Sequence, residues 1–158
     1  MTVKKRHVKK GIRHASMACF ALAMMMVLCV PGSGFCGSSN DPEEKAVQEA
    51  ARNFLDAEVR RDYPAVYACF ASSSPYARSH SYEQYLADVQ ALPHRLVGYR
   101  IVSVNYIQEN EEKIKFPAIE KIAQVEVELK FLQEDTKDLS EINIGFVFFK
   151  ERGKWYKS

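Results

Sequence analysis

The chain has 158 residues, of which 47% are hydrophobic, 27% charged and 11% aromatic. These values are typical of one globular domain and argue against a disordered, collagen-like or coiled-coil chain. The formal net charge is +2, but six basic residues and no acidic residue lie within residues 1–37. Residues 38–158 are therefore net acidic. Because nucleic-acid binding requires a basic surface, we expect no nucleic-acid partner.

Residues 1–37 have the three parts of a secretory signal peptide. A basic stretch ends at Arg13, an uncharged apolar run covers residues 15–30, and small or helix-breaking residues follow. The apolar run is shorter than the roughly 20 residues that span a bilayer comfortably. We therefore expect export to the periplasm or the extracellular space. An uncleaved anchor, and with it a membrane as partner, is the second alternative. A lipoprotein is the third, because neither Cys29 nor Cys36 follows a small residue.

Cysteine use gives no sign of a disulfide framework. Three of the four cysteines lie within residues 1–37, and Cys69 is the remaining one. A single cysteine cannot form an internal disulfide. Its neighbours Ala68 and Phe70 are apolar, so we interpret Cys69 as a small core residue rather than a reactive thiol.

The first part of the acidic domain predicts two helices in succession. Asp41 and Pro42 open the first helix as capping and first-turn residues, and an apolar face with spacings of three and four runs to about Arg60. A shorter helix starts at Asp62. We expect it to end before Pro75, because the residue before a proline is driven away from helical geometry.

A third helix opens at Ser81 with a capping-box pattern and closes before Pro93, after which the hydrophobic period changes to two. Long strands are predicted at residues 96–108, 121–133 and 141–150, with a last short strand around Trp155. On the first strand we expect Val102, Val104 and Tyr106 to share one side. On the second, the regular alternation predicts a buried side made of Val125, Val127, Leu129 and Phe131. Helices followed by an antiparallel sheet define an α+β domain.

The layout resembles the nuclear transport factor 2-like superfamily. The resemblance rests on the opening helix with Ala50, Phe54 and Leu55, and on the segments 62–67, 81–85 and 148–156. It covers about residues 42–158 and is strongest toward small exported members of mostly unassigned role. It implies one cone-shaped domain over residues 38–158, with three N-terminal helices packed on a curved antiparallel β-sheet.

Superfamily members range from enzymes through ligand binders to interaction modules, so the fold alone decides no function. Enzymes of similar fold, such as the ketosteroid isomerases, use a cavity with a carboxylate base and an opposing hydrogen-bond donor. The predicted strands place no carboxylate among their inward-facing apolar residues. Asp56 and Glu58 of the first helix fit its solvated edge equally well. We therefore assign no catalytic residue.

Tyrosines are the best candidates for ligand contacts. Hydroxyls aimed into an apolar cavity can orient a small ligand, although buried tyrosines more often pack in a core. The candidate ligand-binding residues are Tyr63, Tyr67, Tyr82, Tyr85 and Phe131. We expect no cofactor and no metal, since His80 and His94 lie far along the chain from other ligand residues.

The third long strand is apolar on both faces, so its outer face needs a cover. Val147 and Phe149 point opposite to Phe146 and Phe148, and the resemblance implies sheet-to-sheet dimers that would cover them. Val147 and Phe149 are thus the candidate homodimer interface, with neighbouring side chains as the alternative cover.

Three functions remain open at this stage. The preferred one is an exported non-enzymatic domain that binds a small apolar ligand or a protein partner through its cavity and sheet. The alternatives are a lyase- or isomerase-type cavity enzyme and a membrane-anchored component of an envelope assembly.

Overall fold

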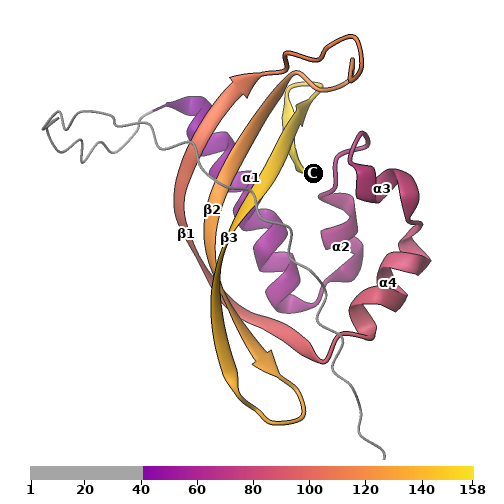
Figure 1. The fold of residues 1–158 in the computed structure, drawn as a ribbon, viewed down its shortest axis with the longest axis vertical. Helices are drawn as coiled ribbons and strands as arrows, with labels where there is room; N and C mark the ends of the chain where they lie inside the picture. The colour runs from indigo at the N-terminus through magenta and orange to yellow at the C-terminus, as the bar shows by residue number, and fades with distance from the viewer. Residues whose placement is uncertain (1–40) are drawn as a thin grey trace, which may run out of the picture. The chain divides into compact units, whose positions relative to one another are not determined.

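A computed structural model describes residues 41–158; the predicted leader and three of the cysteines lie outside this range. The helices are α1 (Pro42–Arg60), α2 (Tyr63–Ala68), α3 (Pro75–Ser79) and α4 (Tyr82–Gln90). The strands are β1 (His94–Glu109), β2 (Lys121–Gln133), β3 (Leu139–Glu151) and β4 (Lys154–Lys157). The strands form one antiparallel sheet in the order β1-β2-β3-β4. As Figure 1 shows, the long strands bend around the helices, which confirms the α+β prediction.

Helix α1 has the predicted bounds and lies against the sheet. The Asp41 carboxylate accepts a hydrogen bond from the Glu43 backbone N–H at 2.9 Å. The helix ends at Arg61, whose φ of 56° is left-handed. The buried residues of α1 are Val47, Ala51, Phe54, Leu55 and Ala57. Among the described residues, no helix is long and apolar enough to span a membrane.

The prediction of three helices is wrong by one, because residues 75–79 form the additional short helix α3. The Ser74 hydroxyl accepts from the Ala77 backbone N–H at 3.5 Å, and Pro75 takes the first turn. A proline at this position loses no helical hydrogen bond, so it starts a helix as readily as it stops one. The next helix, α4, begins as predicted, with the reciprocal capping box of Ser81 and Gln84.

The expectation that Val102, Val104 and Tyr106 share one side of β1 is also wrong. The pairing of β1 with β2 shifts at three places, between Leu96 and Gly98, Ile101 and Ser103, and Val104 and Tyr106. Each shift adds a residue to β1, which breaks the alternation and increases the local twist. Val104 packs against the core, whereas Val102 and Tyr106 are exposed.

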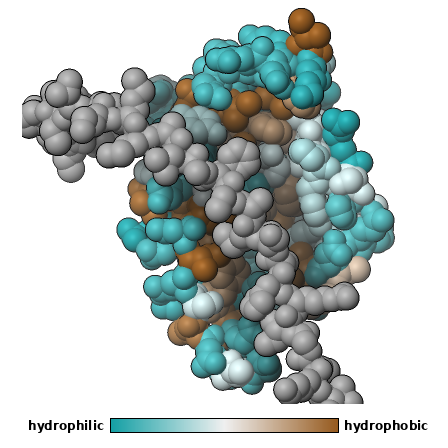
Figure 2. Space-filling model, viewed as in Figure 1, coloured by the Kyte–Doolittle hydropathy of each residue, from teal (hydrophilic) through white to brown (hydrophobic). Residues whose placement is uncertain are grey.

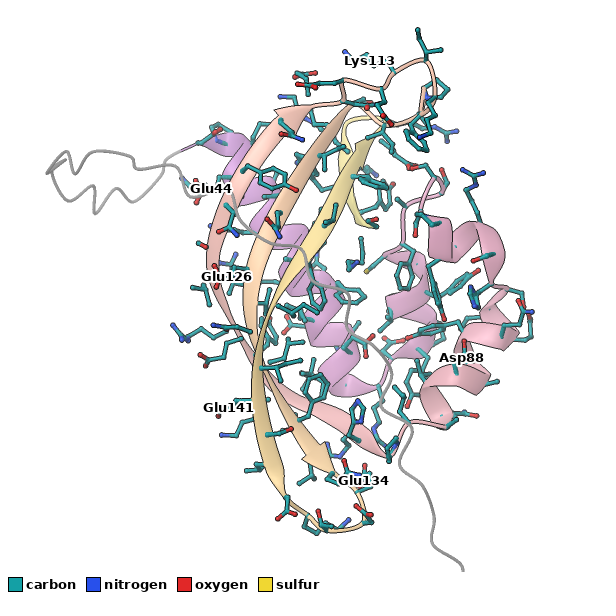
Figure 3. All side chains as sticks on the ribbon, viewed as in Figure 1. Glu44, Asp88, Lys113, Glu126, Glu134 and Glu141 are labelled. Carbon is teal, nitrogen blue, oxygen red and sulfur yellow. The ribbon has the colours of Figure 1, made fainter. Side chains whose placement is uncertain are left out.

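The core lies between α1 and the concave face of the sheet. On β2 the predicted side is confirmed: Val125, Val127 and Leu129 are buried, and Phe131 packs against them. Phe148 of β3 has no exposed surface. On the opposite face, Glu126 and Glu141 project away from the helices (Figure 3). The sheet therefore has one apolar face, covered by helices, and an opposite face that carries charged side chains.

Strand β4 closes the sheet and connects it to the helices. Arg152 and Gly153 both have positive φ, as a two-residue hairpin turn requires, so the predicted turn at Gly153 is confirmed. The buried Glu151 accepts hydrogen bonds from Ser72 Oγ at 2.6 Å and from the Ser73 backbone N–H at 3.0 Å. These contacts fix the segment between α2 and α3 against the edge of the sheet.

Candidate ligand-binding cavity

A cavity of about 630 Å³ lies between the C-terminal part of α1, the end of α4 and the adjacent ends of β1 and β2. Its apolar lining consists of Phe54, Leu55, Val89, Leu92, Leu96, Leu129, Phe131 and Phe146. Its polar lining consists of Glu58, Arg61, Tyr63, Gln90, His94, Arg95 and Glu134. Small-molecule sites in proteins have volumes of roughly 300–1,000 Å³ and a similar mixture of many apolar groups and few polar ones.

The cavity exists because the sheet extends beyond the helices that cover it. Strand β4 pairs only with residues 148–151 of β3, so the first part of β3 is an edge. Ile142 and Ile144 lie opposite Leu129 and Val127 of β2, on the concave face, yet they are 46% and 39% exposed. Over the strands, Figure 2 shows hydrophobic patches between hydrophilic ones. The apolar wall thus continues from the cavity to the surface.

An ion-pair cluster of three side chains forms the mouth of the cavity. Glu134, at the end of the sheet in Figure 3, accepts from the Arg61 guanidinium at 2.5 Å and lies 3.1 Å from Arg95 Nε. Desolvation opposes ionisation of Glu134, but the hydrogen bond from Arg61 and the charges of both arginines lower its pKa. Both guanidinium groups at the mouth are therefore already paired with a carboxylate.

Glu58 is different, because this cavity-lining residue has no hydrogen-bond or ion-pair partner among residues 41–158. Burial raises the pKa of Glu58, and no hydrogen bond or ion pair with residues 41–158 opposes this effect. Every other carboxyl with a shifted pKa in this part of the chain has a pKa lowered by bonds from neighbouring groups. A carboxyl with a raised pKa in a cavity is typical of functional sites.

Two further groups lie within the electrostatic reach of Glu58. Burial raises the pKa of the Cys69 thiol, and the charge of Glu58 raises it further. The same two causes raise the pKa of the Tyr85 hydroxyl. This hydroxyl is buried and has no hydrogen-bond partner among the described residues. The raised pKa keeps Cys69 in the unreactive thiol form, in keeping with its interpretation as a core residue.

The structure separates the predicted ligand-binding residues into two groups. Tyr63 and Phe131 line the cavity, and the Phe131 ring lies 5.1 Å from the ring of His94. The other three tyrosines pack together between α2 and α4. Ring centroids are 5.5 Å apart for Tyr67 and Tyr82 and 5.6 Å apart for Tyr67 and Tyr85. This second group forms a wall of the core and does not line the cavity.

The candidate dimer residues lie on the other face of the sheet. Val147 and Phe149 are half-buried there. Phe149 lines a second hollow, of about 620 Å³, together with Ile122 of β2, Ile119 of the preceding loop and Pro75 of α3. The protein's own loop and α3 thus lie close to Phe149, as the alternative to a dimer requires.

Sequence reasoning did not separate Glu58 from Asp56, but the structure does. Asp56 is exposed and accepts a hydrogen bond from the Tyr99 hydroxyl at 2.7 Å. Glu58 lies four residues after Phe54 and three after Leu55, on the same apolar stripe of α1. A carboxyl on an apolar stripe was the available signal for this residue. Among residues 41–158, no three potential metal ligands gather in one place.

The described residues thus form an α+β domain with a cavity of ligand size between α1, α4 and the sheet. No protein-family model matches the sequence, and the search of curated proteins finds no match. Among solved structures, the chain is similar to a ketosteroid isomerase-like protein from Erwinia carotovora atroseptica, with 19% sequence identity and a TM-score of 0.46. The match covers 74% of this chain and 92% of the other. The function must be argued from this protein's own side chains.

Proposed function

We propose that the protein is an exported domain that binds a small, largely apolar molecule in the cavity beneath α1. The observation that carries the proposal is a space of about 630 Å³ with eight apolar side chains and one unpartnered carboxyl in its lining. This volume lies within the range of small-molecule sites, and the lining combines many apolar groups with few polar ones, as such sites do.

The walls of the cavity define the general chemistry of its ligand. Leu129 and Leu96 are almost fully buried and form a rigid apolar floor between the strands. Leu92 is 50% exposed and stands at the opening. Burial of apolar surface supplies the binding energy of such sites, and the few polar groups fix the orientation. A molecule with an apolar body and one polar group fits this arrangement.

A direct test uses N-phenyl-1-naphthylamine, an uncharged dye whose fluorescence rises in apolar surroundings. The wild-type protein should bind the dye at one saturable site. Val89→Trp places an indole in the cavity and should weaken binding by about tenfold or more. Leu86→Trp, on the same helix but outside the cavity lining, is the matched control. No saturable binding, or equal binding to both variants, would contradict the proposal.

Export, the homodimer and superfamily membership belong to the same proposal. Export is supported by the signal-peptide pattern of residues 1–37, and the homodimer by the apolar side chains of Val147 and Phe149. A native mass spectrum of protein produced with its leader and recovered from the periplasm tests both. We expect a dimer of chains that begin near residue 35–38. An intact leader recovered only from membranes would refute soluble export, and a monomer would refute the dimer.

A cavity enzyme is the second candidate, and Glu58 is the observation that favours it. A carboxyl with a raised pKa in an apolar site is suited to accept a proton from a bound molecule. Its electrostatic neighbour Tyr85 has a hydroxyl with no partner among the described residues. If the natural ligand is recovered with the protein, incubation in deuterium oxide should exchange deuterium into it, and Glu58→Gln should abolish the exchange. An unlabelled ligand leaves the binding function as the better account.

A further inference from the structure

We infer that the ligand carries a cationic amine on its apolar body and that Glu58 binds this amine. The inference rests on the proposed function and adds the chemical class of the ligand. Its basis is that one polar group of the cavity lining, the Glu58 carboxyl, accepts no hydrogen bond from the described residues.

The cations nearest to the cavity do not supply this donor. Arg61 and Arg95 both line the mouth, but both are bound to Glu134, at 2.5 and 3.1 Å. A ligand that carried a carboxylate would have to compete with Glu134 for these guanidinium groups. A ligand that carried an ammonium group would meet an unoccupied carboxyl in Glu58.

The positive charge expected on the ligand follows from the unfavourable free energy of an ionised and unpaired Glu58. An ion in apolar surroundings is unfavourable unless an opposite charge or a hydrogen bond compensates it. Burial alone raises the pKa of Glu58, so the free cavity disfavours the carboxylate. A bound ammonium group removes this penalty and adds a charge-assisted hydrogen bond, which is stronger than a neutral one. A hydroxyl of the same shape provides only the weaker bond.

The effect of Glu58 on amine binding must be distinguished from the effects of the other titratable and charged groups around this end of the cavity. These groups are Arg61, Tyr63, Cys69, Tyr85, His94, Arg95, Glu134 and Lys157. The Lys157 Nζ lies 5.2 Å from the centre of the Phe146 ring, and burial lowers the pKa of Lys157 to about 8. Of these groups, His94 is an imidazole that would repel a bound amine whenever it carries charge. A Glu58 variant that retains His94 distinguishes the two.

The test compares three naphthalene compounds that differ in one group: 2-(1-naphthyl)ethylamine, 2-(1-naphthyl)ethanol and 1-naphthylacetate. Calorimetric titration of the wild-type domain should show the amine binding about tenfold more tightly than the alcohol. The acetate should bind most weakly. Amine affinity should rise as pH increases through the raised pKa of Glu58, because the carboxyl ionises while the ammonium group remains protonated.

Glu58→Gln should reduce amine affinity to that of the alcohol and remove most of the rise with pH. Any rise that remains in the variant does not come from Glu58. Asp56→Asn removes a carboxylate from the exposed side of the same helix and should leave amine binding unchanged. If Glu58→Gln does not fold, carbon-13 NMR of the carboxyls in the wild-type protein tests the inference instead. If the inference is correct, the bound amine lowers the pKa of Glu58.

The possible results distinguish a failure of this inference from a failure of the proposed function. Binding of the uncharged dye without preference for the amine would overturn the amine inference and leave the cavity as a binding site. Preference for the acetate would also overturn it and would assign recognition to Arg61 and Arg95. Absence of binding by the dye and by all three compounds would overturn both proposals.

Discussion

The two ends of α1 present the same chemical group in opposite surroundings. In the first turn, Glu43 accepts hydrogen bonds from Lys150 Nζ at 2.6 Å and from Trp155 Nε1 at 3.2 Å, with Lys121 Nζ at 3.4 Å. The hydrogen bond from Lys150 lowers the pKa of Glu43. In the last turn, Glu58 has no such partner among the described residues, and burial raises its pKa.

The comparison separates a carboxyl whose hydrogen bonds stabilise the fold from a carboxyl that has no partner among the described residues. The Glu43 end connects the helix to three strands, and its bonding groups are matched within the chain. The Glu58 end leaves a carboxyl, a buried Tyr85 hydroxyl and about 630 Å³ of space unfilled. The unfilled end is therefore where a ligand is expected.

The largest expected effect compares a buried phenylalanine with one that lines the cavity. Phe148 has no exposed surface, so Phe148→Ala should lower the free energy of unfolding by about 3–5 kcal/mol. Phe131 is half-buried in the cavity wall, and Phe131→Ala should cost less than about 2 kcal/mol while weakening dye binding. Urea denaturation measures both. Equal losses of stability would show that the cavity wall is packed like the core.

A smaller effect is expected at the paired end of α1. Glu43→Gln removes the charge that binds Lys150 and should destabilise the domain by about 1 kcal/mol, because the group is partly exposed and screened. Since the pKa of Glu43 is lowered, its contribution is present above the unfolded-state pKa and is lost as pH falls through the folded-state pKa. Urea denaturation at several acidic pH values should show this loss in the wild type only. An unchanged stability in the variant at neutral pH would contradict the role of Glu43.

The smallest expected effect has the opposite sign. The pKa of Glu58 is raised, so folding favours its protonated form. Its contribution is present below the unfolded-state pKa and is lost as pH rises through the folded-state pKa. Glu58→Gln should therefore stabilise the ligand-free domain at neutral pH, by less than about 1 kcal/mol. Thermal unfolding of ligand-free protein checks the sign, and a lower melting temperature for the variant would refute it.

Local sequence patterns predicted most of the helices and strands where no other feature of the fold interrupted the pattern. Strand β2 was predicted with its observed bounds, because apolar and polar residues alternate strictly from Ala123 to Phe131. The same rule failed on β1, where three register shifts are imposed by the curvature of the sheet. No periodicity in a single strand reveals such shifts. The helix at Pro75 was missed because a proline is compatible with both the end and the start of a helix.

The candidate site was harder to predict because it depends on which side chains find partners. Tyr63 and Tyr85 look alike in sequence, yet one lines the cavity and the other packs within the core. The difference comes from the packing of α2 against α4, which is a tertiary contact. The apolar stripe of α1 marked Glu58 in the sequence, but its lack of a partner among residues 41–158 is a tertiary property, since the nearby Arg61 and Arg95 both bind Glu134.

The most direct test of this account is a carbon-13 NMR titration of Glu43 and Glu58 in the ligand-free domain, both observed through their side-chain carboxyl carbons. The account predicts a pKa below the ordinary value for Glu43 and above it for Glu58, in the same sample. A Glu58 pKa at or below the ordinary value would contradict it, because the cavity would then already supply a partner for this carboxyl.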